Sequence, residues 1–330
     1  MSDQTEAIEP PDISRLRYVA NMLSAHVTRT PTVAWPVPLE SGGTDMQLFV
    51  KLELLQRTGS FKARGAINTL SHAIQSSNGP FAGATAFSAG NHAIATAYAA
   101  RQLGTTAKVV MPRSANAFRR QRCEELGAEL VFGESISDLI TIVKQIQAEE
   151  GRHLVHPFEG VHTIEGTATV GIELCEDVAQ LDAVIVPVGG SGLIAGVASA
   201  VKQMQPDCQV IGVEPSGANG MQQSLSSGAP KTQVSVSTIA DSLGAPMHAP
   251  HSFSLVRQFV DQIVTVSDDQ LRDGMRRMFT DMKLVVEPAC AASIAALQGP
   301  LARTMHGKRV ALIACGTNID LATYSALLSE

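Results

Sequence analysis

The chain has 330 residues, a formal net charge of −6 and 45 % hydrophobic residues, which suits one large α/β unit or two modest domains that share a cleft. The mild acidity, without any cluster of Lys and Arg, argues against nucleic-acid binding. No apolar run approaches the roughly 20 residues of a membrane span, and Met1 to Ser14 lacks the pattern of a secretory signal. Five scattered cysteines indicate reduced thiols, so we expect a cytoplasmic protein.

Short apolar runs alternate with longer helical patterns along the whole chain. The predicted strands are Leu48–Leu52, Thr85–Phe87, Lys108–Met111, Glu129–Phe132, Ala183–Val188, Gln209–Val213 and Arg309–Cys315. The predicted helices include Asn91–Leu103, Asp138–Glu150 and Leu193–Gln203, the first two stopped by Gly104 and Gly151. The stretch Ser216 to His251 is rich in Gly, Pro and Ser and indicates long loops with one short helix at most. This alternation predicts an α/β fold with a mostly parallel sheet.

The first candidate site segment is Thr58 to Ala66, which follows a predicted strand and opens a predicted helix. Lys62 falls near the start of that helix among apolar neighbours. The helix dipole and burial both lower the pKa of such a lysine, which leaves more of its amine free to attack a carbonyl. A surface lysine on an amphipathic helix is the structural alternative.

The second segment is Ser88-Ala89-Gly90-Asn91-His92, a turn between a strand and a helix. Backbone N–H groups at such a turn suit a carboxylate, and Ser88 and Asn91 add polar side chains. The alternative is that Ser88 or Asn91 simply caps the following helix.

The third segment is Gly189-Gly190-Ser191-Gly192-Leu193, which joins a buried strand to a helix. Glycines let consecutive N–H groups converge, and the helix start adds positive dipole, so the segment has the outline of a phosphate cup. It is neither a Walker loop nor a clean dinucleotide fingerprint. A tight turn without a ligand is the alternative.

The fourth segment is Cys315-Gly316-Thr317-Asn318, at the end of the last predicted strand, where open α/β sheets place ligands. A buried cysteine that packs as a small hydrophobe is the alternative. His153, His156 and His162 lie close in sequence, but they do not share a helical face and give little support for a zinc site.

Taken together and in this order, the four segments resemble the fold-type II pyridoxal-phosphate enzymes, and within them the threonine/serine dehydratase and serine racemase group. The resemblance runs from Arg29-Thr30-Pro31 to Asn318. It implies an α/β fold like that of tryptophan synthase β, with two open, twisted, mostly parallel sheets and flanking helices. It also implies a large cofactor-binding domain, residues 1–79 and 159–330, and a small domain, residues 80–158, that carries the carboxylate loop.

The resemblance further implies a role for each site residue. Lys62 would hold pyridoxal 5′-phosphate as a Schiff base and later take the α-proton of the substrate. The other cofactor-binding residues would be Phe61, Asn91, Gly189, Gly190, Ser191, Gly192, Leu193, Glu287 and Cys315. The substrate carboxylate would bind Ser88, Ala89, Gly90, Asn91 and His92.

Some residues depart from the family pattern. Racemases of this group carry a proton donor at the place of Ala89, whose methyl group cannot transfer a proton, so a dehydratase is favoured. Ser191 interrupts the run of glycines in the cup. Metal-binding members carry a carboxylate near Gly220, which is missing here, although Glu214 remains a possible ligand.

We therefore expect β-elimination of a 3-hydroxy amino acid, such as threonine or serine, to a 2-oxo acid and ammonia. The alternatives are a serine or aspartate racemase, a dehydratase for phenylserine or 3-hydroxyaspartate, a β-replacement enzyme, and a non-catalytic protein that binds a phosphate ligand. The side chain of the substrate is expected to meet Phe158 and the loops of Ser216 to His251. The expected partners are a small amino acid and a second copy of the chain in a homodimer.

Overall fold

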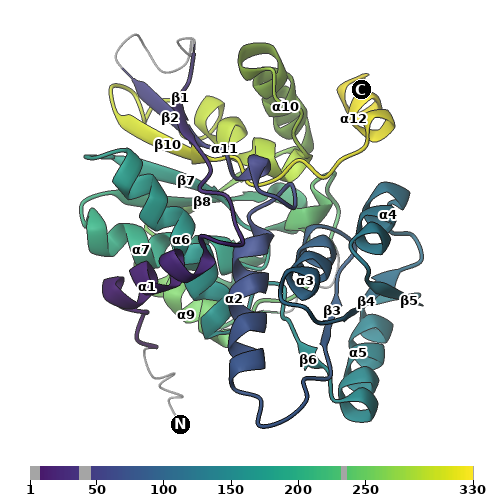
Figure 1. The fold of residues 1–330 in the computed structure, drawn as a ribbon. Coiled ribbons are helices and arrows are strands. Elements are labelled where there is room, and N and C mark those ends of the chain that lie inside the picture. Colours follow the sequence, from purple (N-terminus) through teal and green to yellow (C-terminus); the bar gives the residue numbers. More distant parts are fainter. Residues whose placement is uncertain (1–7, 37–45, 232–235, 330) are drawn as a thin grey trace.

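The computed structural model describes residues 8–36, 46–231 and 236–329, so the expectations for residues 1–14 and 216–251 are tested only in part. Within these residues the strands form two sheets, and helices flank both (Figure 1). One sheet has six strands in the order β1-β2-β10-β7-β8-β9, and the other has four in the order β5-β4-β3-β6. Only the β1–β2 pair is antiparallel among the described pairs. The predicted fold class, α/β with two mostly parallel sheets, is confirmed.

The six-stranded sheet consists of β1 (Thr32–Ala34), β2 (Gln47–Lys51), β7 (Ala183–Pro187), β8 (Gln209–Pro215), β9 (Gln262–Val266) and β10 (Arg309–Ile313). The four-stranded sheet consists of β3 (Ala84–Phe87), β4 (Ala107–Pro112), β5 (Glu129–Gly133) and β6 (His153–Leu154). All seven predicted strands are present. The three strands that the sequence did not reveal are the very short β1 and β6, and β9, an edge strand with a partly exposed face.

The helices of the large sheet form layers on both of its faces. Helices α6 (Val161–Asp177) and α7 (Gly192–Met204) pack together on one side, and α10 (Asp268–Met282) packs on α11 (Pro288–Gln298) on the other (Figure 1). Helix α2 (Lys62–Gln75) packs against α6 and also against α3 (Asn91–Gln102) of the smaller sheet. Helix α2 therefore lies between a helix of the large sheet and a helix of the small sheet.

Six further helices occur in the described residues. They are α1 (Ile13–Leu23), α4 (Ala117–Glu125), α5 (Ile136–Glu150), α8 (Gly220–Ser227), α9 (Pro250–Phe259) and α12 (Leu321–Ser329). None of the helices in the described ranges is long and apolar enough to cross a membrane. All five cysteines are buried free thiols.

Two helices end next to the glycines that the sequence predicts. Gly104 and Gly151 have φ of +69° and +67°, the left-handed conformation that glycine adopts without strain. Helix α5 begins at Ile136, two residues before the predicted start, because Ser135 and Asp138 form a reciprocal capping box. The described residues between 216 and 251 include α8 and two short 3₁₀ turns, and α9 begins at Pro250.

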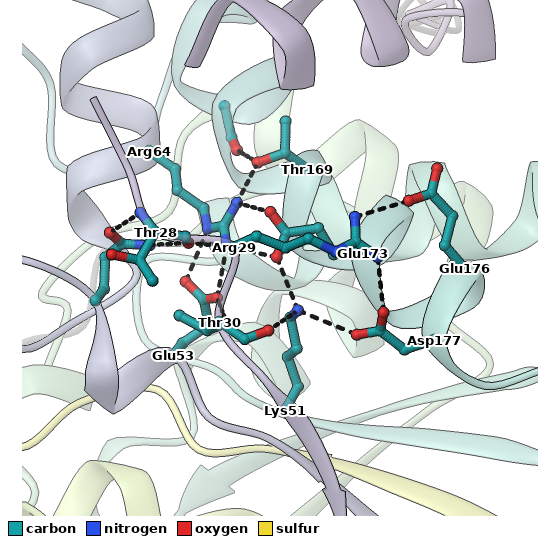
Figure 2. A network of polar contacts seen from close by, with 12 residues as sticks. Thr28, Arg29, Thr30, Lys51, Glu53, Arg64, Thr169, Glu173, Glu176 and Asp177 are labelled. Carbon is teal, nitrogen blue, oxygen red and sulfur yellow. Dashed lines mark hydrogen bonds and ion pairs between the residues drawn. The ribbon is translucent and has the colours of Figure 1, made fainter. Parts of the chain in front are cut away.

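A buried ionic network fixes α2 beside the large sheet (Figure 2). The Arg64 guanidinium is fully buried and forms two hydrogen bonds with the carboxylate of Glu53, at 2.7 and 2.8 Å. It forms two more with Glu173 of α6, also at 2.7 and 2.8 Å. Lys51 of β2 lies 2.7 Å from the same Glu173 carboxylate and donates to the Thr30 carbonyl. One guanidinium thus ties together α2, α6 and the segment that follows β2.

The charges in this network compensate each other. Burial would raise the pKa of Glu53, but Arg64 and the Thr30 hydroxyl outweigh burial and lower that pKa. The Glu53 carboxylate therefore stays ionised against Arg64. A buried, paired and hydrogen-bonded charge adds little net stability, but removal of one partner leaves the others uncompensated.

We predict that Arg64→Leu lowers the free energy of unfolding by about 3–5 kcal/mol, because it leaves the buried Glu53 carboxylate without its ion-pair partner and leaves Glu173 with Lys51 alone. Arg29→Leu is the matched control, since Arg29 pairs with Glu176 and Asp177 at the exposed rim of the same network. That variant should lose less than about 1 kcal/mol. Urea unfolding followed by circular dichroism measures both, and equal losses in the two variants would contradict the prediction.

Candidate active site

One cavity of about 490 Å³ lies at the C-terminal ends of the parallel strands. Its lining includes residues that follow β3, β5, β7 and β10, so both sheets contribute to it. The predicted site residues in the lining are Phe61, Lys62, Ser88, Ala89, Gly90, Asn91, His92, Gly189, Gly190, Ser191, Gly192, Leu193, Glu287 and Cys315. Glu214 is the one predicted site residue outside this lining.

The segment that carries Lys62 is held against the end of β10. The Gly59 carbonyl accepts from Thr317 N–H, and the Cys315 carbonyl accepts from Phe61 N–H. The Asn318 amide donates to the Thr58 carbonyl at 2.8 Å. Gly59 adopts a φ of +72°, and an added Cβ would lie 2.5 Å from the Asn318 side chain. The backbone just before Lys62 is therefore held in place by its contacts with residues 315–318.

Lys62 is the first residue of α2, as predicted, and its amine lies in the cavity wall. The amine donates to the Pro157 carbonyl and lies 5.1 Å from the centroid of the Phe61 ring. Burial lowers the pKa of Lys62 to about 8, although Cys315 and Glu287 act in the opposite direction. A substantial share of this amine is therefore neutral and nucleophilic near neutral pH.

The glycine turn, residues 189–193, presents a row of unused donors. None of its five backbone N–H groups has a hydrogen-bond acceptor among the described residues. The turn is also too tight for side chains: a Cβ at Gly190 would lie 2.1 Å from the Phe158 ring, and one at Gly192 would lie 2.7 Å from the Phe158 carbonyl oxygen. Ser191 has a φ of +71°. Free N–H groups at the start of α7 give this turn the donors that an anion requires.

The carboxylate turn, residues 88–92, has the same character at the start of α3. The N–H groups of Ala89, Asn91 and His92 have no acceptor in the described part of the chain. The alternative role of Ser88 or Asn91 as a helix cap is wrong, because Gly90 is the N-cap residue and no side chain caps α3. Ser88 instead accepts from Gly90 N–H within the turn. The same cavity thus has a second helix start with free N–H donors.

Asn91 and Glu287 form a polar network behind the carboxylate turn. The Asn91 amide donates to Glu287 at 2.7 Å, and its oxygen accepts from Asn318 at 2.6 Å. Burial raises the pKa of Glu287 to about 7, although Arg119 acts to lower it. His92 contacts the Val155 carbonyl, and burial followed by the charge of Lys62 lowers its pKa to about 3, so the ring stays neutral.

Arg119 of α4 lines the cavity and was not identified from the sequence. Its guanidinium donates to Asp241 and, at 3.0 Å, to the Asn318 carbonyl, and lies 3.7 Å from Glu287. A Cβ at Gly90 would lie 3.0 Å from this guanidinium, so Arg119 sits directly behind the carboxylate turn. The local sequence around Arg119 is an ordinary polar helix, and only the fold places it here.

Cys315 lies in the cavity wall beside a second thiol. Its contact with Cys290 and its burial both raise the pKa of the Cys315 thiol well above its ordinary value. The thiol is therefore neutral, and it offers no negative charge to a ligand in the cavity.

Glu214 is occupied by the chain itself. Its carboxylate accepts from the N–H groups of Met221 and Gln222 at 2.7 and 2.9 Å, at the start of α8. Burial raises its pKa to about 7. A role as a metal ligand remains a prediction. Among the described residues, His72, His162 and Glu165 lie close enough to share a metal ion, but the two imidazole rings stack in parallel at 3.8 Å, and their nitrogen lone pairs do not converge.

We predict that in the ligand-free protein the Lys62 amine reacts with acetic anhydride along a titration curve centred near pH 8. An exposed lysine has a pKa of about 10.4, so at pH 7.5 Lys62 carries the larger neutral fraction by roughly two orders of magnitude. Mass spectrometry of tryptic peptides measures the reaction, with exposed Lys144 as the internal reference. A midpoint above pH 10 would contradict the burial argument.

Comparisons with known proteins identify the family and the fold. The model of the family described as "Pyridoxal-phosphate dependent enzyme" matches residues 23–316. The chain is 47 % identical to the phenylserine dehydratase of Ralstonia pickettii, over 98 % of both chains. It is 38 % identical to the L-threo-3-hydroxyaspartate ammonia-lyase of a Pseudomonas species, over 94 % of this chain and 96 % of that protein. The structure of maize serine racemase superposes with a TM-score of 0.90 at 33 % identity, covering 97 % of this chain and 98 % of that one. The chain belongs to the family of pyridoxal-phosphate dependent enzymes.

Proposed function

We propose that this protein is a pyridoxal-phosphate dependent ammonia-lyase that converts a 3-hydroxy amino acid into a 2-oxo acid and ammonia. One observation carries the proposal: the Lys62 amine, with its lowered pKa, lines the same cavity as two helix starts with free N–H groups. Two anion sites and one nucleophilic amine are what a phosphorylated aldehyde and an amino-acid carboxylate require.

The residues present fit the cofactor. The five free N–H groups of the glycine turn would hold its phosphate, and the Lys62 amine would attach to its aldehyde carbon. Phe61, Asn91 and Glu287 would lie around its ring. When bound, pyridoxal phosphate supplies an aldehyde that binds amines covalently and a conjugated ring that accepts electrons. The neutral Cys315 thiol would leave the ring nitrogen without a charged partner, which favours prompt elimination over transamination.

The chain's own groups would then handle the substrate. The free N–H groups of the carboxylate turn would hold the substrate carboxylate and fix the orientation of the α-carbon. The Lys62 amine, once released by the incoming substrate amine, would take the α-proton, since its lowered pKa makes it a base near neutral pH. The 3-hydroxyl would leave as water, and the proton lost from the α-carbon balances the proton that the leaving hydroxide gains. Hydrolysis of the resulting enamine would consume one water and release ammonia. The net products are one 2-oxo acid and one ammonia.

Ala89 favours elimination over racemisation. It lines the cavity within the carboxylate turn, at the place where the family's racemases carry a proton donor. A methyl group cannot deliver a proton to the second face of the α-carbon. Related proteins include a serine racemase from Oryza sativa at 35 % identity, so inversion is the nearest competing activity.

The proposal also covers the domain boundaries, the cellular location and the oligomeric state of the enzyme. We propose a large domain of residues 1–79 and 159–330 and a small domain of residues 80–158, supported by the four-stranded sheet, whose strands all fall between Ala84 and Leu154. The five free thiols support a cytoplasmic location. A homodimer is proposed because dimers are the commonest assembly.

We predict that Lys62→Ala abolishes 2-oxo acid formation and the visible absorbance of the bound cofactor, because no other lining group can replace the amine. The assay follows 2-oxo acid release from a panel of 3-hydroxy amino acids: serine, threonine, phenylserine and 3-hydroxyaspartate. Lys144→Ala is the control and should behave like the wild type, since Lys144 is exposed on α5 and lies outside the lining. Unchanged turnover in Lys62→Ala would refute the mechanism.

We also predict that Ala89→Ser gives measurable inversion of L-serine, because the new hydroxyl places a proton donor in the carboxylate turn. Chiral chromatography of serine after incubation measures the D-isomer. Ala89→Gly is the control, since it changes the size of the residue without adding a donor. Equal amounts of D-serine from both variants would contradict the role given to position 89.

A further inference from the structure

One wall of the cavity is apolar and adjoins the carboxylate turn. It consists of Phe87 at the end of β3, Pro112 at the end of β4, and Ile136 and Leu139 in the first turns of α5, which follows β5. Because β3, β4 and β5 are parallel neighbours, their C-terminal ends lie side by side at one edge of the sheet. A substrate held by its carboxylate at the end of β3 therefore lies next to this wall.

Ile136 is unusual for an aliphatic residue in the lining. It is 49 % exposed, whereas Leu139 is 4 % exposed. The capping box formed by Ser135 and Asp138 fixes the start of α5 and so fixes Ile136. Ala245 and Pro246 add further small apolar surface to the same lining. Exposed aliphatic surface inside a ligand cavity gains free energy when an apolar group of the ligand covers it.

The charges in the lining point to the same kind of ligand. The Lys and Arg residues in the described lining are Lys62, which is required by the chemistry, and Arg119. Arg119 already contacts Asp241, Glu287 and the Asn318 carbonyl. Beside Ile136, the lining residue Glu134 pairs with the exposed Arg113. A second carboxylate on the substrate would therefore meet apolar carbon, and the described lining has no Lys or Arg left to pair with it apart from Lys62.

We propose that the wall formed by Phe87, Pro112, Ile136 and Leu139 binds the substituent on Cβ of the substrate and selects an aryl or other bulky apolar group over a carboxylate. Ile136 is the specificity-determining residue of this wall. The inference rests on the proposed function and narrows its substrate class to 3-hydroxy amino acids with a large apolar side chain.

The kinetic test compares kcat/KM for phenylserine, serine and 3-hydroxyaspartate in the wild type and in three variants. The wild type should prefer phenylserine to 3-hydroxyaspartate by more than tenfold. Ile136→Ala should lower kcat/KM for phenylserine about tenfold, as expected when roughly two buried methylene equivalents are lost, with less than a twofold change for serine. Ile136→Lys should lower the phenylserine value further and raise the 3-hydroxyaspartate value.

Val161→Ala is the matched control. Val161 is 48 % exposed at the first position of α6, and it lies outside the cavity lining. Its removal deletes a β-branched side chain of the same exposure, so it should leave all three kcat/KM values within twofold of the wild type.

A binding measurement tests the wall without turnover. L-Phenylalanine and L-aspartate are phenylserine and 3-hydroxyaspartate without the leaving hydroxyl. Isothermal titration of the holoenzyme should give a lower Kd for L-phenylalanine than for L-aspartate, and Ile136→Ala should raise the phenylalanine Kd about tenfold.

The outcomes distinguish a failure of the proposed lyase activity from a failure of the proposed role of the wall. If no member of the panel yields a 2-oxo acid, the proposed function is wrong, and the proposed role of the wall is wrong as well. If the wild type turns over 3-hydroxyaspartate as well as phenylserine, or if Ile136→Ala changes the serine and phenylserine values equally, the lyase stands and the role of the wall is overturned.

Discussion

The active site depends on a single buried guanidinium that lies outside it. Arg64 is two residues beyond Lys62 on the first turn of α2, and its bonds to Glu53 and Glu173 fix that turn against α6 and the segment after β2. Successive residues of a helix point in different directions, so Arg64 is buried in the network while Lys62 faces the cavity. The bonds of Arg64 therefore help to fix the helix turn from which Lys62 projects, together with the contacts between residues 58–61 and residues 315–318.

Several charged side chains in the cavity lining are paired: Arg119 contacts Asp241, and Glu134 contacts Arg113. Burial keeps His92 neutral, raises the pKa of Glu287 toward neutrality and, together with Cys290, keeps the Cys315 thiol protonated. Besides Lys62, the lining offers the free backbone N–H groups of the glycine and carboxylate turns as donors. Backbone N–H dipoles at a helix start are already oriented, so they can bind an anion such as a phosphate or a carboxylate with little reorganisation.

Helix α4 joins the two sheets behind this cavity. Arg119 contacts Asp241 and the Asn318 carbonyl, and Asn116 at the start of the same helix donates to Asp320 at 2.7 Å. All three partners belong to the half of the molecule with the large sheet, whereas α4 packs on the small one. The carboxylate turn is thus placed relative to Lys62 by contacts that cross between the halves.

The sequence by itself determined the local elements. Apolar runs predicted seven of the strands, glycines predicted the ends of α3 and α5, and three turn motifs predicted the candidate site residues from 58 to 66, 88 to 92 and 189 to 193. These features depend on neighbours along the chain. Tertiary structure alone decided the rest: that Arg119 lies behind Gly90, that Glu214 caps α8, that Asn91 bonds to Glu287 instead of capping α3, and that Ile136 faces the cavity. Each of these depends on which residues distant in sequence come together, and a single sequence carries no local pattern for such contacts.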